Sequence, residues 1–150
     1  MPESRPSSRT GKAGRISFAP GAETSIARTA GAALLVVLGI AWIVVYINVA
    51  QDGQKLAWMA DLTRWNYLIG FGLIFLGLTV AAHPGTPLGR GRGVVVGMLG
   101  CFVLGLLWIV VYYIAGSDFA IPLIRNLSQY NLVVGIGFMA VGFVYATRWE

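Results

Sequence analysis

Four long stretches of this 150-residue chain contain no charged side chain, and they limit what the chain can fold into. They cover residues 30–50, 66–82, 93–117 and 131–147. An α-helix rises about 1.5 Å per residue, so about 20 residues cross the hydrocarbon core of a bilayer. The first and third stretches are long enough, and the other two are near the lower limit. The sequence therefore predicts an all-α integral membrane protein with four transmembrane helices.

The composition favours the same class of protein. Hydrophobic residues make up 57% of the chain and charged residues 11%. A soluble domain holds about 45–50% apolar residues and about 25% charged residues. The helices of a soluble bundle would need polar faces, which these stretches lack. A cleaved signal peptide is not expected either, because the first apolar stretch follows a polar segment over residues 1–29 and exceeds the usual apolar region of about 7–15 residues.

The basic residues predict the orientation in the membrane. If the tail over residues 1–29, the middle loop and the C-terminus share one side, eight of the eleven Lys and Arg residues lie there and three lie opposite. Basic residues remain on the cytoplasmic side. Both termini are therefore predicted to be cytoplasmic in a multi-pass protein of the cell membrane.

The N-terminal tail is basic and rich in Ser, Arg, Gly and Pro. Such a segment cannot bury enough apolar surface to fold alone, so we expect a disordered arm that is attracted to membrane lipids. A docking segment for a cytoplasmic partner remains an alternative. Binding to nucleic acid is not expected, because the tail has no interleaved aromatic residues and no known recognition module.

Two apolar decamers, LGIAWIVVYI from Leu38 and LGLLWIVVYY from Leu104, agree at seven of ten positions. The similarity continues beyond them and predicts two copies of one unit, over residues 30–82 and 93–150, joined by a cytoplasmic linker over residues 83–92. Two helices per unit is an even number, so both copies would cross the membrane in the same direction as a parallel repeat. Apolar spacing also predicts a short surface helix in each outer loop, with Pro122 in the first turn of the second.

Small residues recur on the predicted spans and allow two helix backbones to approach closely. Packing within the four-helix unit is the favoured role, and contact with a partner protein is the alternative. The candidate glycines are Gly39, Gly70, Gly77, Gly97, Gly105, Gly135 and Gly142.

Aromatic and amide side chains form a second group of candidates. Trp42 and Tyr46 share one helix face, as do Trp108 and Tyr112. The tyrosines suit an interfacial belt, whereas the deeper indoles need a hydrogen-bond partner and suggest a helix–helix contact. The predicted interface anchors are Trp65, Asn66, Tyr130, Asn131, Arg148 and Trp149, with both asparagines in the role of helix N-caps.

Residues that usually carry chemistry are scarce. No charged residue lies inside a predicted span, and the chain has one histidine and one cysteine. A disulfide within the chain and a metal cluster built on histidines are therefore excluded, and no cofactor is expected. No nucleophile with a base and no phosphate loop is visible. The sequence predicts a non-enzymatic protein that binds other proteins, lipids or a second copy of itself.

Three motifs in the second half carry a family resemblance. LGLLWIVVYYIAG, YNLVVGIGFMAVGF and the terminal ATRWE resemble the CrgA family of actinobacterial cell-division membrane proteins. The first half resembles the same pattern through LGIAWIVVYI and WNYLIGFGLIFLG but ends in AAHPG without the Arg-Trp pair. The chain thus resembles a tandem duplication of the family's two-helix unit.

The resemblance implies a function at the division septum. It implies that the protein regulates or stabilises septum assembly by contacting FtsZ and the membrane proteins of septal peptidoglycan synthesis. We therefore expect a membrane adaptor of the cell-division machinery. The alternative is a small four-helix transporter or channel, which the size would allow but the absence of a carboxylate within the spans disfavours.

Overall fold

The computed structural model describes residues 25–115 and 120–148. This part of the chain is helical and contains no strand, which confirms the all-α prediction for these residues. The predicted disordered tail over residues 1–29 lies outside the described residues up to residue 24, and its predicted end is wrong because α1 already begins at Ile26. In order, the elements are α1 (Ile26–Val45), η1 (Tyr46–Ala50), α2 (Ala57–Asp61), α3 (Trp65–Ala81), α4 (Arg92–Ala115), α5 (Pro122–Leu127) and α6 (Tyr130–Ala146).

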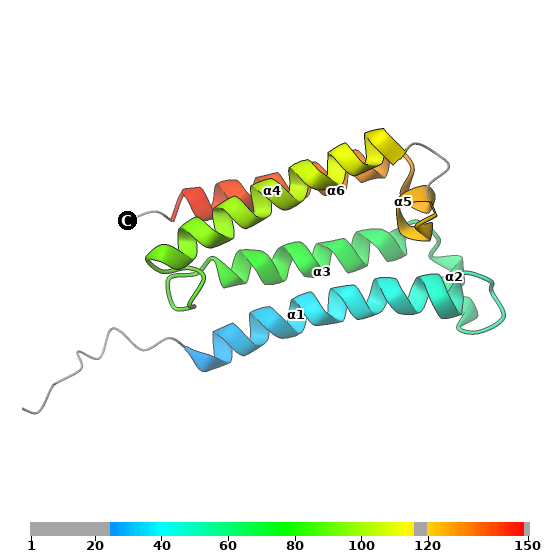
Figure 1. The fold of residues 1–150 in the computed structure, drawn as a ribbon. Coiled ribbons are helices and arrows are strands. Elements are labelled where there is room, and N and C mark those ends of the chain that lie inside the picture. The colour runs from blue at the N-terminus through cyan, green and yellow to red at the C-terminus, as the bar shows by residue number, and fades with distance from the viewer. Residues whose placement is uncertain (1–24, 116–119, 149–150) are drawn as a thin grey trace, which may run out of the picture.

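The long helices form two side-by-side pairs, as Figure 1 shows. Helix α1 packs along α3, and α4 packs along α6, whereas the contact between α3 and α6 is smaller. We call α1 to α3 the first hairpin and α4 to α6 the second hairpin. Helix α1 begins and α6 ends at the same end of the molecule as the loop between the hairpins, and α2 and α5 lie at the opposite end.

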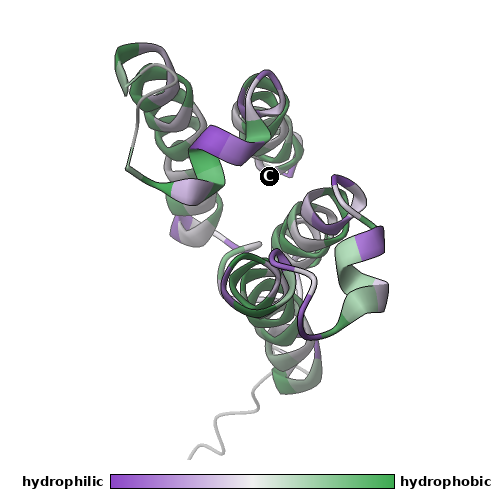
Figure 2. Ribbon diagram, turned by 90° about the vertical axis from the view of Figure 1, so that its right-hand side faces the viewer, coloured by the Kyte–Doolittle hydropathy of each residue, from purple (hydrophilic) through white to green (hydrophobic). Residues whose placement is uncertain are grey.

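Two helices in the described residues are long and apolar enough to cross a membrane. They are Ile26–Ala50, which joins α1 to η1, and Arg92–Ala115, and only 22% of each apolar window is buried. The core helix of a soluble bundle would be mostly covered by its own chain. Figure 2 shows the ribbons of the long helices mostly in the hydrophobic colour, and large apolar side chains such as Leu34 and Leu106 are more than half exposed. Helices α3 and α6 are also apolar but shorter, with 17 residues each.

The short helices α2 and α5 lie where the spacing of apolar residues predicts them. Pro122 is the first residue of α5, as expected, because its ring fixes a helical φ and its missing N–H would have no partner in the first turn. Met59 of α2 and Leu127 of α5 are buried and join one hydrophobic core with residues of α1, α3 and α6. Each short helix therefore covers the end of its own hairpin.

The segment between α1 and α2 contains a π-helical turn that the sequence does not predict. The N–H of Gln51 donates to the carbonyl oxygen of Tyr46 at 2.9 Å, which closes the wider turn. The Asn48 amide donates to the carbonyl oxygen of Val44 at 2.8 Å, and Ala50 is fully buried. The π-helical segment is only five residues long, which is too short for a change of apolar period to be read from the sequence.

The loop between the hairpins folds against the start of α1. The N–H of Ser25 donates to the carbonyl oxygen of Gly85 at 2.8 Å. Nδ1 of His83 accepts the N–H of Gly85 at 3.0 Å and lies 3.3 Å from Nη1 of Arg28. Thr86 is 1% exposed, and its hydroxyl donates to the carbonyl oxygen of His83 at 2.8 Å. The loop is thus a hydrogen-bonded joint between the two hairpins.

Candidate helix-packing seams and inter-hairpin pocket

Gly39 and Gly70 bring the backbones of α1 and α3 together in the first hairpin. A β-carbon on Gly39 would lie 2.5 Å from the carbonyl oxygen of Gly70 and 2.7 Å from Cγ1 of Ile74. A β-carbon on Gly70 would overlap the side chain of Ile43. Real β-carbons do not approach other atoms so closely, so only glycine allows this separation of the helices.

Gly105 and Gly135 hold the equivalent positions in the second hairpin. A β-carbon on Gly105 would lie 2.6 Å from the carbonyl oxygen of Gly135. A β-carbon on Gly135 would overlap the side chain of Ile109 and lie 3.0 Å from the carbonyl oxygen of Gly105. The two hairpins therefore use the same glycine pair in the same way.

The remaining candidate glycines are also buried between helices, but their neighbours differ between the hairpins. A β-carbon on Gly77 would lie 2.8 Å from a backbone carbonyl oxygen of α1. A β-carbon on its counterpart Gly142 would lie 3.2 Å from the ring of Phe102, and a β-carbon on Gly97 would overlap the ring of Tyr145. Because all seven glycines face a helix of their own hairpin, contact with a partner protein at these positions remains a prediction.

Trp42 and Trp108 occupy matching positions but contact different elements. The ring of Trp42 packs edge-on against Trp58 of α2, with 5.9 Å between centroids. The ring of Trp108 packs edge-on against Phe71 of α3 at 5.8 Å and so joins the two hairpins. Both indole N–H groups are buried without a hydrogen-bond partner. The expected helix–helix contact is thus seen between hairpins only for Trp108.

The two tyrosines that follow these tryptophans also differ. Tyr46 is 7% exposed and packs edge-on against Tyr67 of α3, with 5.2 Å between ring centroids. Tyr112 is half-buried, and the centroid of its ring lies 5.4 Å from that of its neighbour Tyr113. The place of Tyr46 inside the first hairpin does not suit the belt role expected of it, whereas Tyr112 retains that role as a prediction.

Asn66 does not cap α3, so the N-cap prediction is wrong for this residue. The helix begins at Trp65, which places Asn66 inside its first turn, and the side chain donates where a cap would accept. Its Nδ2 donates to the carbonyl oxygens of Met59 at 2.7 Å and Thr63 at 3.1 Å. The side chain is 0% exposed, so it ties α2 to the start of α3 from inside.

Asn131 makes the same pair of hydrogen bonds in the second hairpin, and the N-cap prediction is wrong there as well. Its Nδ2 donates to the carbonyl oxygens of Ile124 at 2.7 Å and Ser128 at 2.8 Å. Both asparagines lie three residues after a non-glycine residue of positive φ, which is 43° at Thr63 and 47° at Ser128. This backbone turn presents the carbonyl oxygen to the amide and explains why asparagine follows at that spacing.

The remaining predicted anchors lie at the ends of the helices. Trp65 is 63% exposed and Tyr130 is 51% exposed, as a residue in contact with a membrane interface would be. The guanidinium of Arg64 lies 5.9 Å from the centroid of the Tyr130 ring and so links the hairpins at this end. Arg148 follows α6 and is exposed. Trp149 lies outside the described residues, and all of these anchor roles remain predictions.

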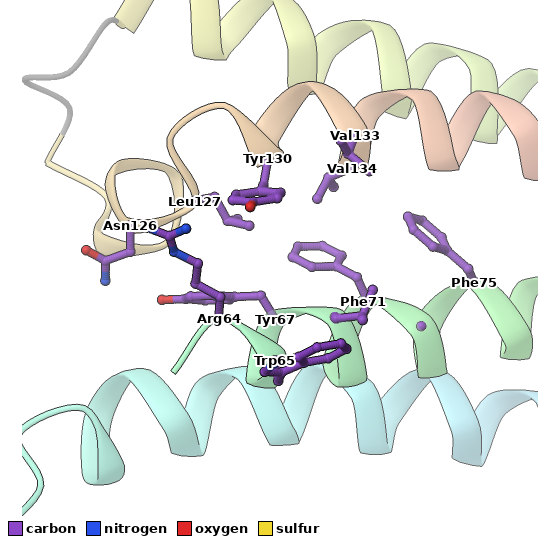
Figure 3. A pocket seen from close by; sticks show the side chains of 12 residues that line it. Arg64, Trp65, Tyr67, Phe71, Phe75, Asn126, Leu127, Tyr130, Val133 and Val134 are labelled. Atoms are coloured by element: carbon purple, nitrogen blue, oxygen red, sulfur yellow. The ribbon is translucent and has the colours of Figure 1, made fainter. Parts of the chain in front are cut away.

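A pocket of about 380 Å³ lies between the hairpins, near the ends where α3 and α6 begin. Figure 3 shows Phe71 and Phe75 of α3 facing Val133 and Val134 of α6 across it, with Arg64 nearer its outer end. The lining does not continue along α3 beyond Phe75, which packs edge-on against Phe138 at 5.0 Å. The pocket therefore occupies the half of the interface between the hairpins that lies near α2 and α5, which we call the outer half.

The pocket was not predicted from the sequence, although an alignment of the two halves of the chain contains a clue to it. Phe75 of α3 lies against Gly137 of α6, where a β-carbon would lie 2.5 Å from the ring. When Asn66 is aligned with Asn131, which lies 65 residues later, Phe75 aligns with Ala140 and Gly72 aligns with Gly137. The methyl group of Ala140 is too short to cover Gly72, and a β-carbon there would have no neighbour within 4 Å. The small side chain at the position that aligns with Phe75 thus leaves the space open.

Comparison with known families assigns the chain. The model of the cell-division protein CrgA family matches residues 1–83 and residues 88–150, which together include both hairpins. The chain belongs to the CrgA family. The resemblance read from the sequence motifs is thereby confirmed, and a role in cell division follows from the family.

Curated CrgA relatives match this chain over shorter segments. CrgA of Streptomyces avermitilis is 47% identical over 53 residues, which are 35% of this chain and 60% of the relative. CrgA of Corynebacterium aurimucosum is 40% identical over 53 residues, or 35% of this chain and 56% of the relative. CrgA of Corynebacterium glutamicum strain R is 48% identical over 42 residues, which are 28% of this chain and 43% of the relative. The chain thus spans about half the length of the curated relatives it matches.

No solved structure matches the chain. Within residues 25–115 and 120–148, no group of three or more His, Cys, Asp or Glu residues is placed to hold a metal ion. The candidate functional features of this CrgA-family chain are the glycine contacts within each hairpin, the buried Asn66 and Asn131, and the pocket between the hairpins.

Proposed function

We propose that this protein is a non-enzymatic membrane adaptor of the cell-division machinery that regulates or stabilises septum assembly. The observation that carries the proposal is the match of a cell-division family to both halves of the chain. The adaptor mechanism is supported by the apolar outward faces of α1 and α4, where side chains such as Leu34, Val37, Val103 and Leu106 are about half exposed. These faces offer lipids and partner helices a contact surface that the chain itself does not cover.

The proposal includes four membrane spans in two parallel two-helix repeats, over residues 30–82 and 93–150. Helices α3 and α6 lie along the two longer helices, and their 17 residues give about 25 Å of apolar length, close to a bilayer core of about 30 Å. The paired contacts of Gly39 with Gly70 and of Gly105 with Gly135 support a repeat. Both termini and the joint at residues 82–91 would be cytoplasmic, and the basic tail would face cytoplasmic division proteins.

The proposed partners are membrane lipids, FtsZ, the membrane proteins of septal peptidoglycan synthesis, and a second copy of the chain in a homo-oligomer. They rest on the family resemblance and on the exposed apolar faces. The pocket does not support the transporter alternative, because its lining stops at Phe75 in the outer half of the interface.

A fluorescent fusion to the full-length protein is expected to concentrate at division septa. Deletion or overexpression of the gene is expected to change the spacing or frequency of septa, because the adaptor would alter how division proteins assemble. Fluorescence microscopy with a membrane dye measures both effects. A four-helix membrane protein of unrelated function, fused to the same fluorophore, is the control. Uniform fluorescence around the envelope together with normal septation would contradict the proposal.

The proposed topology predicts the results of reporter fusions. Alkaline phosphatase fused after Lys55 or Phe119 is expected to be active, because these positions would lie outside the cytoplasm, and a fusion after Leu88 is expected to be inactive. A reporter that fluoresces only in the cytoplasm should give the opposite pattern at the same positions. Activity of the phosphatase fused after Leu88 would overturn the assignment of orientation from charge.

A further inference from the structure

The walls of the pocket between the hairpins suit an apolar ligand. Leu68, Phe71 and Phe75 of α3 line one side, and Val133 and Val134 of α6 line the other. The volume of about 380 Å³ lies at the lower end of the range of about 300–1,000 Å³ that is typical of ligand pockets. From Arg64 to Phe75 the lining follows α3 for about 16 Å at the helical rise. The space is therefore long, apolar and closed at its inner end.

The outer end of the same pocket carries hydrogen-bond donors and a positive charge. Arg64 lies there beside the ring of Tyr130. Tyr67 is 93% buried, and its hydroxyl lies near the amide of Asn126, yet neither Oη of Tyr67 nor Nδ2 of Asn126 completes a hydrogen bond of ordinary geometry. Among the described residues that line the pocket, none is acidic. The exposed guanidinium of Arg64 therefore favours a ligand that brings an anionic hydrogen-bond acceptor to the mouth of the pocket.

We propose that this pocket binds one acyl chain of an anionic glycerophospholipid, with the lipid phosphate beside Arg64. The acyl chain lies between Phe71 and Val133 and extends over Gly72, where the structure leaves space. The phosphate oxygens accept hydrogen bonds from the exposed guanidinium of Arg64 at the mouth of the pocket. The assignment to the extracytoplasmic leaflet rests on the proposed topology, because the helix ends that carry Arg64 and Tyr130 would lie on that side.

The shape of the pocket argues against the other occupants. A transmembrane helix has a diameter of about 10–12 Å and would need a groove along the whole span, whereas this pocket ends where Phe75 meets Gly137 and Phe138. Free phosphate would pair with Arg64 at the mouth but would leave the apolar space unfilled. A lipid satisfies both parts at once.

The experiment compares lipid retention by the purified full-length protein. The protein is equilibrated with mixed micelles that contain phosphatidylglycerol and phosphatidylcholine with matched acyl chains, and the bound lipid is then measured by native mass spectrometry. The wild type is expected to retain phosphatidylglycerol in preference to phosphatidylcholine. Replacing Arg64 with glutamine is expected to lower that preference about fivefold, as for the loss of one basic residue next to an anionic lipid. Equal retention of the two lipids by the wild type would overturn the proposal.

A matched pair of glycine variants tests the position of the ligand. Gly72→Leu fills the pocket, and Gly100→Leu places the same side chain on α4, where a β-carbon also meets nothing within 4 Å. Loss of bound phosphatidylglycerol in Gly72→Leu and wild-type retention in Gly100→Leu is the expected result. Equal retention in both variants would place the lipid elsewhere and overturn the proposal. Circular dichroism of each variant confirms that it is folded.

A photo-crosslinking residue at Val133 identifies the occupant without filling the pocket. Crosslinks to phosphatidylglycerol in vesicles that contain both lipids support the proposal. Crosslinks to a second copy of the chain or to another protein would overturn it. These readouts use purified protein and do not depend on septation, so failure of the adaptor role and failure of the lipid site can be told apart.

Discussion

Replacing Gly39 with leucine is expected to force α1 away from α3 and to destabilise the first hairpin. The new side chain would meet the carbonyl oxygen of Gly70, where even a β-carbon would lie at 2.5 Å, and a backbone atom cannot move aside as a flexible side chain can. Overpacking of a close-packed interior costs about 1–3 kcal/mol, and a backbone contact places this variant at the upper end. Unfolding of the purified protein in increasing SDS, followed by circular dichroism, measures the loss.

Gly31 provides the control for this variant, because it lies on the same helix and a β-carbon there would meet nothing within 4 Å. Gly31→Leu is expected to unfold at nearly the wild-type SDS concentration. In the second hairpin, Gly105→Leu and Gly100→Leu form the equivalent pair. If Gly39→Leu and Gly31→Leu were equally stable, close packing of the two backbones would not be what holds the hairpin together.

Replacing Asn66 with alanine is expected to release α2 from the start of α3. The change removes the amide that donates to Met59 at 2.7 Å and to Thr63 at 3.1 Å, and the buried carbonyl oxygens then lack that donor. Each buried polar group left without a partner costs about 1–3 kcal/mol. Hydrogen exchange read by mass spectrometry is expected to show faster exchange of the backbone amides in α2, with little change in α4.

Asn48 is the control for the asparagine variants, because its amide makes one hydrogen bond to a carbonyl oxygen of its own helix and is exposed. Asn48→Ala is expected to leave the exchange of α2 unchanged. Asn131→Ala is expected to affect α5 as Asn66→Ala affects α2. Since the two asparagines lie in different hairpins, their effects on stability should add to within about 0.5 kcal/mol. A silent Asn131→Ala would mean that the matching hydrogen bonds do not serve matching roles.

The sequence predicted the positions of the long helices well because uncharged stretches report on length and burial directly. The stretch over residues 66–82 corresponds to α3 at Trp65–Ala81, and the stretch over residues 131–147 corresponds to α6 at Tyr130–Ala146. Pro122 marked the start of α5 for an equally local reason, since its ring fixes φ. These features depend on neighbours in the chain, so they can be read from the chain alone.

The features that the sequence did not predict depend on contacts between distant segments. Asparagine is common at helix N-caps, so the sequence predicted that role for Asn66. The sequence did not indicate that the Asn66 amide donates to the carbonyl oxygen of Met59 in α2. The different environments of Trp42 and Trp108 arise because only one of them faces the other hairpin. The pocket depends on the small side chain of Ala140 at the position that aligns with Phe75. The effect of this difference in size appears only when α3 and α6 are packed together.

The hydrogen-bonded joint at residues 82–91 has a consequence for stoichiometry. Two hairpins on separate chains would pair only above a concentration set by their affinity, and their ratio would follow the expression of each. A short tether instead gives the second hairpin an effective concentration of about millimolar beside the first. Because the joint is held to α1 through Ser25 and Gly85, the orientation of the pair is restricted as well. The pairing should therefore stay one to one at any expression level.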